Sequence, residues 1–243
     1  MRLIRNPRVI TLWILVFLFS AAEAQSENQE TVRTRPDIPG LFSVDFGLNQ
    51  AINPPPTGFK RGFWGSRALN VTYYKPIRLG KSKFSFAPGI GIAMERFKWA
   101  NFYLLRDTTD NAEVYDLVPN NLYPGLKKSQ LAWSYLEIPL EFRFDANPAD
   151  PGRTFWCSIG GRVGLRMTTQ TKVKMKEDDG IHKIKDRDKF GLNDVRLAAT
   201  VRWGVGGFGW YVNYNITPLF EKGKGPQKTD FNVLTAGITL NGL

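Results

Sequence analysis

The chain has 243 residues and carries 33 Lys and Arg against 22 Asp and Glu, which gives a net charge of +11 at neutral pH. Its single Cys excludes a fold held by internal disulfides, and its single His excludes a metal site built from several histidines. The length suits one domain, so the stability of the fold must come from packed secondary structure.

Residues 1–24 have the three parts of a secretory signal peptide: a basic start, a short apolar run and a cleavage pattern of small residues. The apolar run, Leu12 to Phe19, is too short to cross ~30 Å of hydrocarbon as a helix. No Cys lies near the cleavage site, so a lipid anchor is not expected. We therefore predict an exported protein whose mature form starts near Gln25.

Removal of residues 1–24 takes away three Arg and one Glu, which leaves 30 basic and 21 acidic side chains and a balance of +9. A basic exported protein favours anionic neighbours such as lipid head groups or acidic glycans, while export argues against nucleic acid as a partner. Residues 25–40 are polar, with two Pro and a Gly, and are predicted to form a flexible periplasmic tail. No long apolar helix follows, so insertion into a membrane would have to use strands.

From Leu41 onward, apolar residues recur at every second position in eight segments. The segments are residues 42–50, 68–75, 84–96, 134–144, 155–167, 194–203, 209–216 and 231–240. In SYLEIPLEFRF (134–144), for example, Ile138 and Leu140 alternate with Glu137 and Glu141. Alternation of this kind predicts β-strands that have one apolar and one polar face.

The connections between these segments are long and short in turn. The short ones lie near residues 76–83, 146–153 and 204–208, and the long ones near residues 51–65, 97–129, 168–193 and 217–230. In an antiparallel meander this order gathers the short turns at one end and the long loops at the other, as in outer-membrane barrels. We predict that residues 41–243 form an all-β domain, an eight-stranded antiparallel up-and-down transmembrane β-barrel with short periplasmic turns and long extracellular loops.

Alternation does not show which face points inward. A soluble, lipocalin-like barrel would place its apolar face inside, whereas a membrane barrel would place it outside. The polar face is rich in glycine, whereas the apolar face is bulky; its glycines are Gly47, Gly89, Gly91, Gly160, Gly164 and Gly237. Small residues fit the narrow interior of an eight-stranded barrel, which favours the membrane alternative.

The polar face also carries charged residues of both signs, which suit a packed and hydrogen-bonded lumen. The predicted lumen residues are Asp45, Glu95, Glu137, Glu141, Arg143, Arg162, Arg166, Arg196 and Arg202. We expect the carboxylates to pair with arginines on other strands in a structural network. A gated or proton-sensitive lumen is the functional alternative.

Aromatic residues near the strand ends are a third sign of a membrane barrel, because aromatic girdles are expected at both interfaces. These residues are Tyr73, Trp99, Trp133, Phe155, Trp203 and Trp210. Cys157 falls on the apolar face and is expected to face lipid.

Few residues offer catalytic chemistry. His182 is the only His and lies in a predicted loop, and neither a nucleophile elbow nor a zinc-protease motif occurs. Glu137 and Glu141 would lie ~13 Å apart on one strand, which is too far for a paired acid and base acting on one bond. We expect no catalytic residue, no metal site and no cofactor.

The loop at residues 168–193 alternates Lys with Thr, Val and Met near its start. We therefore expect its strands to continue as a hairpin with a turn at Asp178-Asp179-Gly180. Contact with lipopolysaccharide phosphates or with a partner protein is one interpretation of its charge. A solvated charged hairpin is the other.

The stretches FWGSRALNVTYYKPIRLGKSKFSFAPGIGI (63–92) and YLEIPLEFRF (135–144) resemble the outer-membrane barrels of the Bacteroidota that are grouped under the name PorT. The resemblance covers residues 41–243. It implies an accessory part in type IX (Por) protein secretion, with other secretion-system or envelope proteins as partners, because so narrow a barrel is not itself a conduit. The ending Asn241-Gly242-Leu243 and the polar tail depart from common outer-membrane barrels.

Three hypotheses on function follow. The leading one is a non-enzymatic outer-membrane protein that contacts partners through its loops, tail or turns. The second is a surface barrel for adhesion or envelope integrity. The third is a lipid A hydrolase or acyltransferase at the outer rim, with His182 as its base.

Overall fold

The computed structural model describes residues 40–54, 63–99, 102–107, 114–119, 125–150, 152–177 and 180–242. The chain divides into Met1–Ile38 and Pro39–Leu243, and the fold below is that of the second unit. The predicted signal peptide (1–24) and residues 25–39 of the predicted tail lie outside the described residues. Among the described residues, no helix has the length and apolar character needed to span a membrane.

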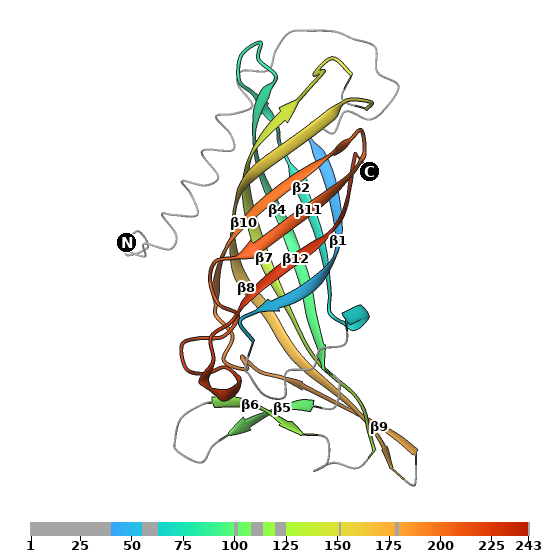
Figure 1. Ribbon diagram of the computed structural model, residues 1–243, viewed down its shortest axis with the longest axis vertical. Coiled ribbons are helices and arrows are strands. Elements are labelled where there is room, and N and C mark those ends of the chain that lie inside the picture. The colour runs from blue at the N-terminus through green and yellow to red at the C-terminus, as the bar shows by residue number, and fades with distance from the viewer. Residues whose placement is uncertain are drawn as a thin grey trace, which may run out of the picture. The chain divides into compact units, whose positions relative to one another are not determined.

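The described residues form strands and two short 3-10 turns (Figure 1). The strands are β1 (Leu41–Ile52), β2 (Arg67–Tyr74), β3 (Ile77–Arg78), β4 (Phe84–Trp99), β5 (Phe102–Asp107), β6 (Val114–Pro119), β7 (Leu126–Asp145), β8 (Phe155–Glu177), β9 (Gly180–Arg187), β10 (Val195–Val205), β11 (Phe208–Asn215) and β12 (Asn232–Asn241). The 3-10 turns are η2 (Phe63–Gly65) and η4 (Pro226–Lys228).

Eight of these strands form a closed antiparallel ring in the order β1, β2, β4, β7, β8, β10, β11 and β12. The last strand pairs back to the first, with Phe46 of β1 opposite Ile238 of β12. Each predicted segment overlaps one ring strand, and the short and long connections lie at opposite ends of the ring (Figure 1). The prediction of an eight-stranded up-and-down barrel is therefore confirmed.

The apolar face of the ring points outward. Ile159 and Phe142 are 64% and 58% exposed, whereas Glu141, which lies beside Phe142 in the chain, is 3% exposed. The alternation holds along whole strands, as in β10, where every second residue is buried. The soluble alternative, in which the apolar face fills the interior, is wrong. Apolar residues outside and charged residues inside are the arrangement of a transmembrane barrel.

The small residues of the inward face allow a large side chain to lie across the lumen. Gly47 and Gly237 are direct cross-strand partners in the β1–β12 pair. A Cβ atom on Gly47 would lie 2.3 Å from the hydroxyl oxygen of Tyr211, and one on Gly237 would lie 1.9 Å from the carbonyl oxygen of Phe46. A Cβ atom on Gly237 would meet backbone atoms, so this position requires glycine, whereas one on Gly47 would have to displace the Tyr211 side chain.

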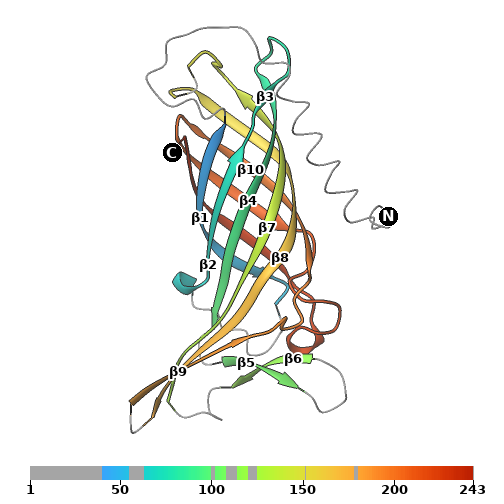
Figure 2. The ribbon, with the colours of Figure 1, turned by 180° about the vertical axis from the view of Figure 1, so that it is seen from behind.

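Two of the predicted long loops are partly strand. β4 continues to Trp99, β7 begins at Leu126 and β8 runs to Glu177, so paired strands project beyond the ring at its long-loop end (Figure 2). β9 pairs with the end of β8, with Gly180 opposite Glu177, which confirms the predicted hairpin; Asp178 and Asp179 lie outside the described residues. Within the predicted loop 97–129, β5 and β6 form a separate two-stranded sheet at the same end.

Candidate functional site

The inward face of the ring carries a network of buried charged side chains. At its short-turn side, Arg202 of β10 pairs with Asp45 of β1 and donates through Nη1 to Ser43 Oγ at 2.8 Å. The Nε of the same guanidinium lies 3.5 Å from Glu141 Oε1 on β7. Because these strands lie on different sides of the ring, the contacts connect its walls through the lumen.

Glu141 receives two further hydrogen bonds. Tyr74 of β2 donates its hydroxyl to Oε1 at 2.6 Å, and Ser158 of β8 donates to Oε2 at 2.7 Å. Both oxygens are thereby satisfied, which is the condition for holding a carboxylate away from water.

Arg162 of β8 lies at the centre of the network. Its guanidinium nitrogens lie 3.4 Å from Glu137, 3.6 Å from Asp45 and 3.7 Å from Glu141. Its side chain is about as buried as the carboxylates that surround it, so the three anions share this cation, and each of them also contacts Arg196 or Arg202.

Arg196 of β10 completes the network on the long-loop side. It binds Glu95 through Nη1 at 2.6 Å and Glu137 through Nη2 at 2.5 Å. Its guanidinium carbon also lies 4.3 Å from the centre of the Tyr135 ring. Seven predicted lumen residues therefore lie together, and each is at most 4% exposed: Asp45, Glu95, Glu137, Glu141, Arg162, Arg196 and Arg202.

The other two predicted residues, Arg143 and Arg166, lie near the ends of the lumen and pair with local carboxylates. Arg143 binds Asp145, two positions along its own strand, at 2.9 Å and stacks 4.5 Å from the Trp156 ring. Arg166 pairs with Asp194 just before β10. Each arginine takes the carboxylate nearest to its own rim, so neither reaches the central network.

The lumen also holds little free space at its short-turn side. A cavity of about 10 Å³ is lined there by Tyr74, Glu141, Arg143 and Trp156, among others. That volume accommodates about one water molecule. The described side chains therefore pack closely against one another at this level.

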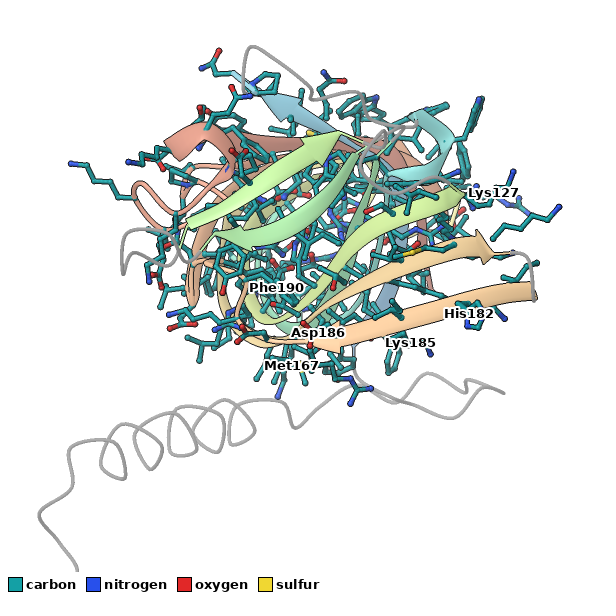
Figure 3. The ribbon with its side chains drawn as sticks, turned by 90° about the horizontal axis from the view of Figure 1, so that it is seen from below. Lys127, Met167, His182, Lys185, Asp186 and Phe190 are labelled. Carbon is teal, nitrogen blue, oxygen red and sulfur yellow. The ribbon has the colours of Figure 1, made fainter. Side chains whose placement is uncertain are left out.

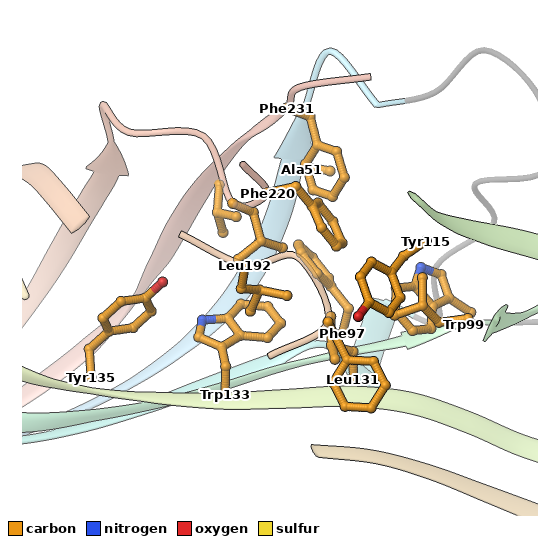
Figure 4. Packing of buried hydrophobic residues seen from close by; sticks show 14 residues of the cluster. Ala51, Phe97, Trp99, Tyr115, Leu131, Trp133, Tyr135, Leu192, Phe220 and Phe231 are labelled. Carbon is orange, nitrogen blue, oxygen red and sulfur yellow. The ribbon is translucent and has the colours of Figure 1, made fainter. Parts of the chain in front are cut away.

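At the long-loop end, the inward face becomes apolar. Fourteen buried residues form one cluster, here called the mouth cluster: Ala51, Phe97, Trp99, Leu104, Tyr115, Leu131, Trp133, Tyr135, Phe190, Leu192, Leu219, Phe220, Phe231 and Val233. Figure 4 shows these side chains converging from ring strands and from the loops. Phe97 packs against Trp133 at 5.3 Å and against Phe231 at 6.1 Å between ring centres. The cluster fills the lumen between the charge network and the long-loop end.

An ion-pair network joins the two loops that contribute to the mouth cluster. Lys189 contacts Asp194 at 3.0 Å and Glu221 at 2.5 Å, and Lys224 contacts Glu221 at 2.7 Å. Hydrogen bonds from Arg166 and then Lys189 lower the pKa of Asp194, and those from Lys189 and Lys224 lower the pKa of Glu221. Hydrogen bonds to the same two carboxylates raise the pKa of Lys189.

Among the described residues, the expected aromatic girdle is clear at the short-turn end. On the short-turn side, outward rings pair across neighbouring strands, as in Phe84 with Phe144 at 5.3 Å and Phe42 with Tyr73 at 5.1 Å. Trp99 and Trp133 are each 2% exposed and belong to the mouth cluster, so placing them in a second girdle was wrong. They fall on the inward phase of β4 and β7, which becomes apolar beyond Glu95.

His182 lies on the β8–β9 hairpin. It is exposed on β9 opposite Met175, and the next pair on the same face is Ile184 with Val173. No hydroxyl lies at these neighbouring positions to act as a nucleophile. Among the described residues, no group of three or more His, Cys, Asp or Glu is placed to hold a metal ion.

Sequence reasoning missed Tyr74, Tyr211 and the mouth cluster. The tyrosines sit on the inward phase, where a hydroxyl among charged residues was a usable sign of a lumen partner. The sequence indicates the mouth cluster less clearly. On the inward face of β4 beyond Met94, Phe97 and Trp99 replace the small residues that precede them.

Comparison with known proteins finds similar solved structures. No protein-family model and no curated protein matches the chain. The structure of Ail, the attachment invasion locus protein of Yersinia pestis, in complex with the heparin analogue sucrose octasulfate is 11% identical, with a TM-score of 0.35, over 84% of this chain and 100% of that chain. The N-terminal β-barrel domain of Pseudomonas aeruginosa OprF is 7% identical, with a TM-score of 0.27, over 84% and 98%. Both scores are low, so the fold rests on the strand pairing of this chain itself.

Proposed function

We propose that this protein is a non-enzymatic barrel of a bacterial outer membrane that keeps its lumen closed and acts through the surface at its long-loop end. The observation that carries the proposal is the double filling of the lumen, by the charge network in its middle and the mouth cluster at its end. A barrel filled in this way is not a diffusion pore. Long strands that continue past the ring support placing the long-loop end outside the cell.

Conductance in planar bilayers tests the closed lumen. The refolded mature protein should add no steady conductance steps at voltages at which a diffusion porin conducts. Circular dichroism of the same sample must show β-structure, so that a silent trace does not reflect unfolded protein. Steady open channels from folded protein would contradict the proposal.

The outer-membrane location rests on the predicted signal peptide and on the outward apolar face of the ring. Fractionation tests it separately. The mature protein should sediment with the outer membrane and should need detergent for release. Recovery in the soluble periplasmic fraction after gentle lysis would refute the location.

A role as an accessory of type IX secretion is the finer form of the proposal, and it rests on the resemblance of residues 63–92 and 135–144 to PorT-type barrels. Deletion of the gene tests it. Proteins with a C-terminal sorting domain should then disappear from the medium and accumulate in the periplasm. Normal secretion of these proteins would exclude the role in type IX secretion and would leave the proposal of a closed outer-membrane barrel unchanged.

A surface role in adhesion or envelope integrity is the second candidate, and the β8–β9 hairpin favours it. Figure 3 shows the hairpin with His182, Lys185 and Asp186 labelled. Ile181 and Ile184 of the same strand are 56% and 53% exposed. Shortening the hairpin while secretion stays intact should reduce surface binding or raise envelope leakiness. The third hypothesis, an enzyme at the rim, is disfavoured by the neighbours of His182, and an unchanged lipid A mass profile in the gene deletion would remove it.

A further inference from the structure

On four neighbouring strands, the outward face of the barrel changes from apolar to polar and basic toward the long-loop end. On β4, the outward residues run from Phe84 to Met94 without a charge, and the next two are Arg96 and Lys98. On β2, the outward residue beyond Leu69 is Arg67. Figure 2 shows β2, β4, β7 and β8 side by side, so the change forms a boundary across the sheet.

The same change occurs on β7 and β8 with the help of a β-bulge. The register shifts between Ser134 and Tyr135 of β7, where Met167 of β8 is the extra residue. Beyond that shift, the even-numbered residues of β8 face outward, with Lys172 opposite Gln130 and Lys174 opposite Lys128. We call the outward residues beyond the boundary the basic face: Arg67, Arg96, Lys98, Lys128, Lys172 and Lys174.

The basic face contains like charges directly opposite one another. Arg67 is the cross-strand partner of Arg96, and Lys128 is the partner of Lys174. The β9 strand extends the pattern, with Lys185 opposite Lys172. Like charges in direct opposition destabilise a sheet, so a bound anion would stabilise this arrangement.

The described residues of the chain do not provide that anion. Arg67 donates through Nε to the backbone carbonyl of Trp64 at 2.5 Å, and Arg96 donates through Nε to that of Gly65 at 3.1 Å. Neither guanidinium pairs with a carboxylate of the described residues. Asp186 pairs across with Thr171 and therefore lies on the opposite face of the hairpin.

A groove opens on the outer wall at the boundary itself. It has a volume of about 450 Å³ and is lined by apolar Phe46, Leu69 and Met94 and by the two arginines, Arg67 and Arg96. Ser134, Thr168 and Gln170 complete its polar side. An apolar floor beside two guanidinium groups matches a molecule that has an acyl chain and an anionic head group.

We propose that the basic face binds the phosphate groups of a membrane lipid, with one acyl chain of that lipid in the groove against Phe46, Leu69 and Met94. Arg67 and Arg96 form the primary phosphate site, because arginine matches phosphate oxygens with paired donors. The lysines of β7 and β8 extend the positive surface to further phosphates. This inference rests on the proposed membrane location.

Lipid binding by the folded mature protein in neutral detergent micelles tests the proposal. The probes are diphosphoryl lipid A, the same glycolipid without phosphates, and inorganic phosphate, with binding measured by native mass spectrometry. The variant Arg67→Gln/Arg96→Gln should bind diphosphoryl lipid A about tenfold or more weakly, because hydrogen bonds between charged groups are lost. The control Lys81→Gln/Lys83→Gln removes two charges at the short-turn end and should bind like the parent protein.

Three results would overturn the inference: equal affinity of the arginine variant and the control, equal binding of the glycolipid without phosphates, or full displacement by inorganic phosphate at equal concentration. The last result would show an anion site that does not select a lipid. If circular dichroism shows that the arginine variant does not fold, Lys172→Gln/Lys185→Gln replaces it, with at least a threefold loss expected. Insertion of the parent protein into vesicles is measured separately, so failure of the membrane location and failure of this site give different results.

Discussion

At the scale of single residues, the interior depends on contacts between buried charges of opposite sign. Arg162 lies within 4 Å of three carboxylates from β1 and β7, all of which are almost fully buried. A buried ion pair contributes little net stability compared with apolar packing, but removal of one partner leaves uncompensated charge in a medium that solvates it poorly. Loss of one arginine therefore destabilises the fold by much more than formation of the complete network stabilises it.

The substitution Arg162→Met should lower the free energy of unfolding by about 3–5 kcal/mol, because three carboxylates lose their shared cation. Urea denaturation of the refolded protein in lipid vesicles measures the change. Arg153→Met, at an exposed position in a short turn, is the matched control and should change the value by less than about 0.5 kcal/mol. Similar effects of both variants would show that Arg162 is not part of a buried network.

The close approach of β1 and β12 at Gly47 and Gly237 gives a second prediction at this scale. Gly237→Ala should destabilise the barrel by about 1–3 kcal/mol, because the new methyl group would meet the carbonyl oxygen of Phe46. Gly152→Ala should be nearly neutral, since the nearest atom to its Cβ is 3.7 Å away. The same denaturation assay compares the two, and equal midpoints would count against the close approach of β1 and β12.

At the scale of the element, the period of two predicted all eight ring strands, because a single alternation repeats along each strand, and the glycines and charges of the polar face predicted that this face points inward. It did not predict where the strands end. In β4, charged residues replace apolar ones on the outward phase beyond Met94, while aromatic residues appear on the inward phase. The alternation within β4 cannot show that this change of residue types marks the end of the apolar belt, because partners of Phe97 lie in loops far along the chain.

The boundary predicts that the same substitution, isoleucine to arginine, costs much more stability on one side of it than on the other. Ile138→Arg places a cation on the outward face of β7 within the apolar belt and should cost about 2–4 kcal/mol. Ile181→Arg, on β9 beyond the belt, should change stability by less than about 0.5 kcal/mol. Unfolding in vesicles measures both, and equal costs would mean that the two positions share one environment.

The loop ion pairs also belong to this scale. The lowered pKa values of Asp194 and Glu221 mean that these groups stabilise the folded loops above their unfolded pKa of about 4, and that this contribution is lost as pH falls through their folded values. The raised pKa of Lys189 adds stability below about pH 10.4, which is lost as pH rises further. Loop order should therefore be greatest between these limits.

Amide exchange corrected for intrinsic rates tests this window. The protection of Asn193, whose amide donates to Leu219 across the two loops, should be constant from pH 5 to 8 and should fall below about pH 4. Asp194→Asn should reduce protection at neutral pH and weaken its pH dependence. An unchanged pH profile in this variant would exclude Asp194 as the group responsible.

At the scale of the whole molecule, the barrel exposes apolar residues and buries charged ones, which is the reverse of a soluble domain. Its two ends also differ. Along β4, the outward apolar residues from Phe84 to Met94 cover ~33 Å of strand at ~3.3 Å per residue, which corresponds to ~25 Å of height at a tilt of ~40°. One rim of this belt is aromatic and the other is basic. The sequence was sufficient for the ring and for most of the lumen charges, but the closed mouth depends on contacts between distant segments.

The central claim is that the outward face of the ring lies in hydrocarbon, and spin labels on single cysteines test it most directly. In a Cys157→Ser background, labels at Leu197, Ala199 and Val201 of β10 should be accessible to oxygen and protected from a water-soluble nickel complex in vesicles. A label at Lys185 of β9 should be accessible to the nickel complex. Equal access of the nickel complex to the β10 labels and the β9 label would contradict the claim.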